Sequence, residues 1–164
     1  MKGVIIYKSR YGSTKQYAEW LRDETGFDLY DVKQAPGDLS SYDIVVIGSS
    51  VFAGRLALAG WIKKQWPSLQ GKTVLLLMTH IRDNEQETAN VVPQRLPAEI
   101  VERIKVFPVG GRYSLQRMGV MDKTLIKMVS SMEKNPQVKR ELLAERDEVK
   151  KENLRGLLEY ISGM

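Results

Sequence analysis

The sequence predicts an α/β protein in which helices cover both faces of a mainly parallel β-sheet. Short apolar runs alternate along the chain with segments of helical periodicity, and most runs are nearly continuous, as in parallel strands buried on both faces. Such alternation is typical of a three-layer, doubly wound architecture with right-handed crossovers. The 164 residues suit a single domain, residues 1–164, because neither a repeat nor a linker divides them.

Five segments are expected to form the strands of this sheet. Four are apolar runs, and the fifth, residues 27–32, alternates apolar and polar side chains, which favours an edge strand. In chain order the expected strands are residues 4–7, 27–32, 44–47, 74–78 and 104–109.

The connecting segments carry helix signals of different strength. One helix is expected to begin near Ser13, and a second is expected over residues 58–66, where Pro67 would end it. Residues 93–102 are a weaker helix candidate because they contain two prolines. Residues 33–42 are too short and too rich in Pro, Gly and Ser for a helix between the second and third strands.

The C-terminal third contains a methionine-rich helical pattern. Apolar residues step by 3, 3, 4, 3 and 4, which predicts one helical face that packs on the core; a surface for an apolar substrate is the alternative. Those residues are Leu115, Met118, Met121, Leu125, Met128 and Met132. Asn135 and Pro136 interrupt the helix, and residues 153–161 form a last amphipathic helix with Asn153 as its expected N-cap.

Composition narrows the functional classes. The chain has no cysteine, which excludes disulfides and thiolate chemistry and fits a cytoplasmic location. Its apolar N-terminal run is too short for a signal peptide, and no segment reaches a membrane-spanning length. With a single histidine and no carboxylate cluster at ligand spacing, we expect neither a metal site nor a Ser-His-Asp triad.

The net charge of +5 is concentrated in one region. Residues 101–140 hold nine Lys or Arg against three acidic residues. Such a basic face suits an anionic partner, such as a nucleic acid, a membrane surface or an acidic small molecule, and a merely solvated face is the alternative. Because few aromatic residues lie among these charges, nucleic acid is not the expected partner.

Residues 9–14 lie where the first expected strand ends, the edge at which ligands bind to open α/β sheets. Gly12 lets the backbone approach a ligand, and the following helix directs its free N–H groups at the loop, a combination that binds phosphate. Arg10 and Lys15 would add attraction. The hydroxyl donors are Ser9, Ser13 and Thr14.

Residues 9–14 do not match the common phosphate loops of other α/β families. The Walker pattern and the G-x-G-x-x-G dinucleotide pattern are absent, and the acidic residues of a receiver domain are missing. A turn that only caps the helix remains the alternative to a phosphate site.

Two segments resemble one known family. "SRYGST" (9–14) resembles the phosphate loop of flavodoxins, and "YDIVVIGSSVFAGRL" (42–56) resembles their third strand and the loop after it. The resemblance covers essentially the whole chain. It implies a flavodoxin-like fold, with a five-stranded parallel sheet in the order 2-1-3-4-5, and FMN as the cofactor.

The resemblance also implies a set of cofactor-binding residues, drawn from four loops at one edge of the sheet. These are Ser9, Arg10, Tyr11, Gly12, Ser13 and Thr14; Ser49, Ser50, Val51, Phe52, Ala53, Gly54 and Arg55; Thr79, His80 and Ile81; and Gly111 and Tyr113. Phe52 either covers the flavin face or belongs to the core. His80 either contacts the flavin ring or is structural, and Tyr113 would reach the dimethylbenzene side.

Charge separates this chain from the electron-carrying flavodoxins, which are typically acidic. The chain is basic, with a pI near 9.4, and Arg55 lies in the loop that would approach the pyrimidine end of the flavin. A cation there stabilises the anionic reduced flavin, so we predict a higher reduction potential than in a typical flavodoxin. A solvent-facing Arg55 is the alternative.

A third segment resembles a particular enzyme branch. "GGRYSLQRMGVMDKTLIKM" (110–128) resembles the basic segment of menaquinone-dependent protoporphyrinogen oxidases, the matching positions being Arg112, Tyr113, Arg117, Asp122, Lys123, Ile126 and Lys127. This resemblance implies an oxidoreductase of heme biosynthesis that passes electrons from a porphyrinogen through FMN to a quinone. It also implies a peripheral position on the inner membrane face. Arg112, Arg117, Lys123 and Lys127 would form the substrate or membrane surface.

Two other functions stay open from the sequence. The protein could be an electron carrier that docks an acidic redox protein through its basic face, or a flavin-free module that binds an anion. No residue is assigned a catalytic role.

Overall fold

A parallel sheet forms the centre of the molecule. The computed structural model describes residues 1–52, 54–80 and 85–164. Parallel pairing joins five strands in the order β2-β1-β3-β5-β6, and the short β4 (Arg55–Leu56) pairs antiparallel with β3. The predicted fold class and the strand order 2-1-3-4-5 are confirmed, with β5 and β6 as the fourth and fifth strands. The strands are β1 (Gly3–Lys8), β2 (Asp28–Asp31), β3 (Ile44–Phe52), β5 (Thr73–His80) and β6 (Ile104–Gly110).

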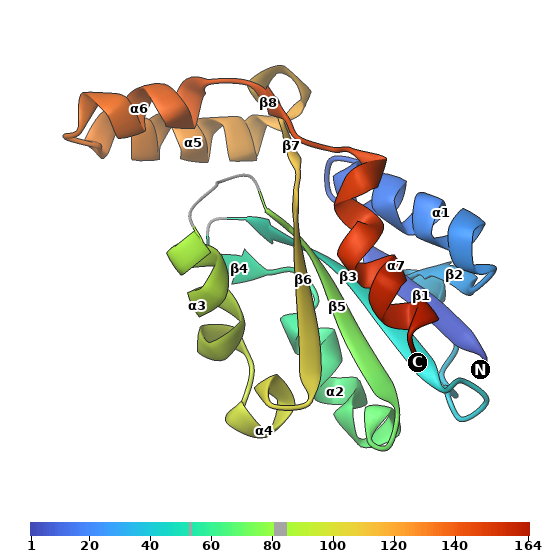
Figure 1. Cartoon of the computed structure of the whole chain (residues 1–164). Coiled ribbons are helices and arrows are strands. Elements are labelled where there is room, and N and C mark those ends of the chain that lie inside the picture. Colours follow the sequence, from blue (N-terminus) through green and yellow to red (C-terminus); the bar gives the residue numbers. More distant parts are fainter. Residues whose placement is uncertain (53, 81–84) are drawn as a thin grey trace.

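Helices cover both faces of the sheet (Figure 1). On one face lie α1 (Ser13–Thr25) and α7 (Arg155–Ser162); on the other lie α2 (Ala59–Leu69), α3 (Glu85–Arg95) and the short α4 (Ala98–Val101). No α-helix joins β2 to β3, as predicted; a 3-10 turn, η1 (Val32–Gln34), follows β2.

The strands divide the hydrophobic core in two, because successive side chains of a strand point to opposite faces. Ile5, Val46 and Leu75 belong to the cluster beneath α1 and α7. Their strand neighbours Val4 and Val45 belong to the cluster beneath α2, α3 and α4. The sheet is therefore buried on both faces, which explains the nearly continuous apolar runs.

A long segment, residues 112–147, separates β6 from the last helix, and we call it the excursion. Its ends, β7 (Arg112–Tyr113) and β8 (Arg146–Asp147), pair antiparallel. Between them, η2 (Leu115–Arg117) leads into α5 (Val120–Met132) and α6 (Pro136–Leu143). Figure 1 shows these two helices side by side, beyond the edge where the parallel strands end. No helix among the described residues is long and apolar enough to cross a membrane.

The prolines affect the helices differently from the prediction. Pro67 lies inside α2, which continues to Leu69, because Trp66 and Leu69 stay buried and their packing holds the last turn. The candidate over 93–102 is two helices, since α3 ends at Arg95 and α4 begins after Pro97.

Asn153 is not an N-cap. It lies within the 3-10 turn η3 (Lys151–Leu154), and α7 begins at Arg155 without a side-chain cap. Its Nδ2 instead donates to the hydroxyl of Tyr17 at 2.7 Å and to the carbonyl of Glu148 at 2.8 Å.

The predicted core-packing methionine face is also wrong. The chain bends between η2 and α5, so the helical phase changes before Val120 and only Met118 of the four methionines is buried. The buried positions of α5 are Asp122, Ile126 and Ser130. Its exposed methionines are Met121, Met128 and Met132, at 86%, 54% and 74% exposure.

Candidate functional site

The turn from β1 into α1 presents an uncapped helix N-terminus. Gly12 precedes the helix with φ of 93°, a conformation that glycine adopts readily, and no side chain caps the first turn. The first turn contains no acidic residue. Ser9 lies beside it, and its hydroxyl oxygen accepts from the N–H of Gly12 at 3.0 Å. The N–H groups and positive dipole end of α1 thus face a loop that contains hydroxyls.

Two further segments hold this loop in place. The hydroxyls of Thr14 and Thr79 lie 2.7 Å apart, both side chains being nearly inaccessible to solvent. The hydroxyl of Ser13 accepts from the N–H of Arg112 at 2.9 Å. Residues after β1, on β5 and after β6 therefore meet at one point, as parallel strands allow at their carboxyl ends.

Each of the four predicted cofactor loops contributes some of its residues to the lining of one small cavity. Its volume is about 30 Å³, well below the roughly 300 Å³ of a small-ligand site. A flavin ring needs more room than this cavity offers. The lining residues are Ser9, Arg10, Tyr11, Ser13, Thr14, Ser50, Val51, Phe52, Thr79, His80, Gly111 and Arg112.

An apolar cluster joins the excursion to these loops. Tyr113, Met118 and Ile126 are buried together, and Tyr11 and Phe52 pack against them. Phe52 thus lines the cavity and also packs in this cluster. Tyr113 is 5% exposed and its hydroxyl donates to the carbonyl of Leu142, so it packs within the excursion.

Arg10 differs most from its expected role. Its guanidinium forms an ion pair with Asp122 at the start of α5, and the hydroxyl of Tyr11 donates to the same carboxylate. The sequence predicted no role for Asp122 in the cofactor loops and named it only as a position that matches the protoporphyrinogen oxidases. The available signal was that Asp122 is the single acidic residue between positions 103 and 132.

Some predicted residues do not line the cavity. Ser49 is fully buried and its hydroxyl accepts from the N–H of Leu58 at 3.0 Å, so it supports the turn after β3. The carbonyl of Gly54 accepts from Arg95 at 2.8 Å, and Arg55 is exposed on β4. Ala53 and Ile81 lie outside the described residues.

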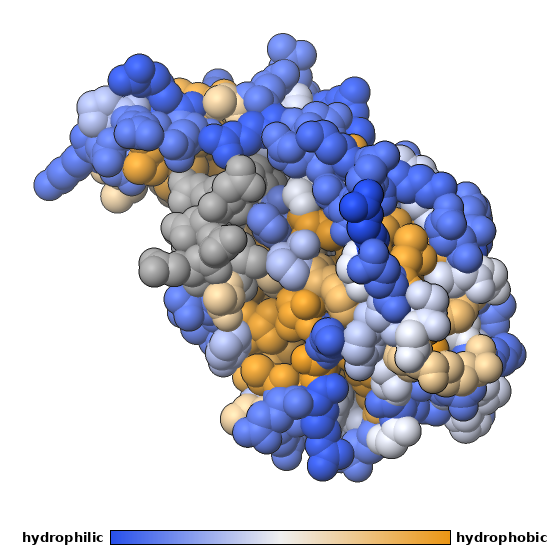
Figure 2. All heavy atoms as spheres, in the orientation of Figure 1, coloured by the Kyte–Doolittle hydropathy of each residue, from blue (hydrophilic) through white to orange (hydrophobic). Residues whose placement is uncertain are grey.

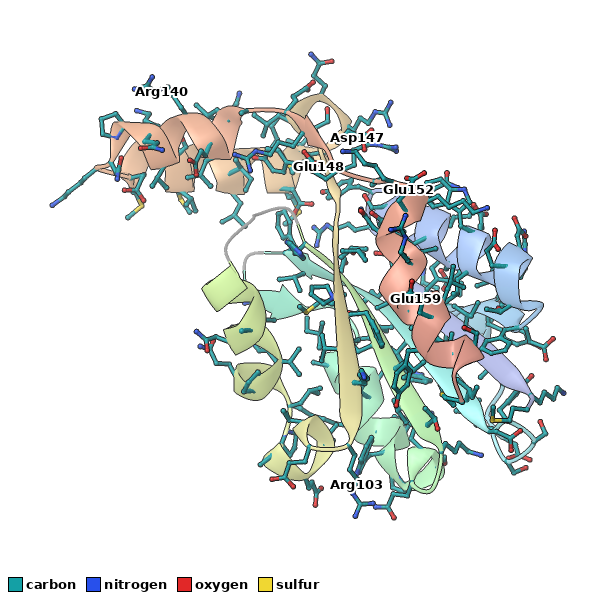
Figure 3. The ribbon with its side chains drawn as sticks, in the orientation of Figure 1. Arg103, Arg140, Asp147, Glu148, Glu152 and Glu159 are labelled. Carbon is teal, nitrogen blue, oxygen red and sulfur yellow. The ribbon has the colours of Figure 1, made fainter. Side chains whose placement is uncertain are left out.

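The predicted basic surface lies on the excursion but is not uniform. Arg112 pairs with Asp147 at 2.7 Å across β7 and β8, whereas Arg117 and Lys127 are exposed and Lys123 is half-buried. Desolvation acts to raise the pKa of Asp147, but hydrogen bonds from Arg112 and from the N–H of Val149 hold that pKa below its usual value. Figure 3 shows Asp147 and Glu148 where the chain returns towards α7.

The donor set of the loop fits the phosphate of FMN. The hydroxyl oxygens of Ser9 and Ser13 accept hydrogen bonds within the chain, so their protons remain able to bond an anion. Together with the N–H groups at the start of α1, they form a site that needs no formal cation.

Several solved structures of flavodoxins and flavoproteins are similar to parts of this chain. A search of curated proteins finds no significant match. Among solved structures, a WrbA-like flavodoxin from Agrobacterium tumefaciens aligns at 16% identity over 74% of this chain and 87% of that chain, with a TM-score of 0.50. A flavoprotein in complex with FMN from Lactobacillus acidophilus NCFM aligns at 20% identity over 66% and 91%, with a TM-score of 0.49.

Flavodoxin 2 from Bacillus cereus aligns at 19% identity over 67% of this chain and 84% of that chain, with a TM-score of 0.48. The family model described as a flavodoxin domain matches residues 4–139, which is most of the sequence. The chain belongs to the flavodoxin family.

Proposed function

We propose that the protein is an FMN-dependent oxidoreductase with a small-molecule substrate. The observation that carries the proposal is the apolar cluster in which Tyr113, Met118 and Ile126 of the excursion pack against Tyr11 and Phe52 of the cofactor loops. An electron carrier functions with an exposed flavin edge that a partner protein can approach. A segment that packs on the cofactor loops suits an enzyme that selects a substrate beside the flavin.

The excursion favours an apolar substrate with acidic groups. Met121, Met128 and Met132 are exposed on α5, and adaptable methionine side chains suit contact with an apolar ring. Lys123 and Lys127 lie on the same helix and can pair with carboxylates. We propose a porphyrinogen as electron donor and a quinone as acceptor, as the resemblance of residues 110–128 to protoporphyrinogen oxidases implies.

The same surface supports docking on an anionic membrane from the cytoplasmic side. Figure 2 shows hydrophobic residues interspersed among hydrophilic ones on the hairpin of α5 and α6. Val120 and Met121, both more than 80% exposed, lie beside Lys123 at the start of α5. Lysines attract anionic lipid headgroups and neighbouring apolar side chains enter the boundary with the acyl chains, and a membrane is where a lipid-soluble quinone resides.

An electron carrier is the second candidate, because the basic excursion could instead dock an acidic redox protein. The deciding experiment adds protoporphyrinogen to the FMN-loaded protein under exclusion of oxygen, with and without menaquinone, and follows porphyrin fluorescence. We expect fluorescence to rise only with quinone. No oxidation, combined with rapid electron transfer to an acidic redox protein, would favour the carrier.

Two variants test the cofactor site and the membrane surface separately. Replacing Ser9, Ser13 and Thr14 together by Ala removes the hydroxyl donors, and we expect the purified protein to lose its flavin absorbance. Replacing Met121 and Met128 by Gln leaves those donors intact. We expect normal FMN content but weaker sedimentation with anionic liposomes, and retained sedimentation would contradict the membrane proposal.

A further inference from the structure

Asp122 links the excursion to the phosphate loop. It is 7% exposed, and its carboxylate accepts from the guanidinium of Arg10 and from the hydroxyl of Tyr11. Both partners belong to the loop after β1, more than 100 residues away in the sequence. A buried carboxylate therefore lies against the loop that receives the cofactor phosphate.

This ion pair compensates the positive charge of Arg10, which the sequence analysis expected to attract the phosphate. Arg10 is paired with Asp122, bonds the hydroxyl of Tyr11 at 3.3 Å and lies 5.0 Å from the ring centroid of Phe52. The second cation, Lys15, lies 3.8 Å from Glu19 one helical turn further on. The loop thus offers a phosphate mainly neutral donors.

We propose that Asp122 is a specificity-determining residue of the cofactor site, which weakens the preference for phosphorylated over unphosphorylated flavin by holding Arg10. The inference rests on the proposed FMN function. Arg10 lines the same cavity as Ser9 and Ser13, yet its charge is already compensated by Asp122. A phosphate dianion must share Arg10 with Asp122 and is repelled by that carboxylate.

The test compares the affinities of FMN and riboflavin for the flavin-free full chain, measured by quenching of flavin fluorescence. The ratio of the two affinities isolates the phosphate contribution, since both flavins share the ring and the ribityl chain. Asp122→Asn keeps the shape of the side chain and removes its charge. We expect the ratio to rise about tenfold, which corresponds to about 1.4 kcal/mol, in the range of one charge-assisted hydrogen bond.

A double-mutant cycle tests whether Arg10 is the residue that Asp122→Asn frees to bind the phosphate. Adding Arg10→Gln to Asp122→Asn should cancel the rise, whereas Arg10→Gln alone leaves the Asp122 carboxylate without its cation and should lower the ratio. The matched control is Glu141→Gln, which removes the same charge from an exposed position on α6, outside the cavity lining, and should leave the ratio unchanged.

Several outcomes would overturn the proposal. An unchanged or lower ratio in folded Asp122→Asn would show that the carboxylate only braces the loop. If Asp122→Asn fails to fold, as judged by circular dichroism, the Arg10→Gln arm decides, because an unchanged or higher ratio there would show that the unpaired Asp122 carboxylate does not act on the phosphate. Failure of the native chain to bind either flavin would instead refute the FMN function itself.

Discussion

The hydroxyl of Tyr17 joins three parts of the fold, so its removal should be costly. It donates to the carbonyl of Gly110 at the end of β6 at 2.7 Å and accepts from Asn153 at 2.7 Å and from the N–H of Lys150 at 3.3 Å. Gly110 precedes the excursion, and Lys150 and Asn153 follow it. The hydroxyl therefore fastens both ends of the excursion to α1.

Tyr17→Phe keeps the buried ring and its edge-on contact with Trp20, whose centroid lies 5.7 Å away, and deletes only the hydroxyl. Water can replace the bond to the exposed Lys150, but the bonds to Gly110 and Asn153 are lost. At roughly 1 kcal/mol for each, we expect the free energy of unfolding to fall by about 2 kcal/mol.

Urea unfolding of the flavin-free protein, followed by circular dichroism, measures this loss without a contribution from cofactor binding. The control is Tyr160→Phe, because the Tyr160 ring keeps its contact with Phe107 and with Lys105, and its change should stay within about 0.5 kcal/mol. A loss below about 0.5 kcal/mol for Tyr17→Phe as well would refute the role given to the hydroxyl.

Three further predictions concern pH, backbone and charge. Burial raises the pKa of Tyr17 and of Tyr42 above the usual value of 10.0, so both neutral hydroxyls stabilise the fold below pH 10. That stability should be lost as the pH rises above 10, and the urea midpoint of Tyr17→Phe should fall less steeply there than that of the native protein. Gly12→Ala should destabilise by about 1 kcal/mol, because φ is 93° although no atom within 4 Å would meet the added Cβ; an unchanged melting curve would contradict this. Arg55→Gln should lower the two-electron flavin potential by about 10–20 mV, the effect of roughly 0.5–1 kcal/mol for an exposed charge, and spectroelectrochemistry showing a rise would refute it.

The strands were predictable because their signal is local. Residues 4–7, 44–47 and 74–78 are apolar without interruption, and a strand buried on both faces requires this whatever its neighbours are. The structure extends these strands by a few residues at their ends but moves none of them.

Helix ends were less predictable, because packing overrides local preference. Pro67 did not end α2, since Trp66 and Leu69 remain buried on either side of it. Asn153 is of a residue type that often caps helices, but its side-chain amide donates instead to the hydroxyl of Tyr17, which is distant in the sequence. The methionine pattern failed because one bend before Val120 changes which residues of α5 face inward.

The sequence by itself determined the fold class, the strand order expected from the family, and the loop of hydroxyls and glycine at residues 9–14. These features depend on residues close together in the chain, or on the periodicity that a buried sheet imposes. Only the tertiary structure decided what the charges do. Arg10 and Asp122 meet across more than 100 residues of chain, and no local pattern records such a contact, because it depends on how the excursion folds back over the end of the sheet.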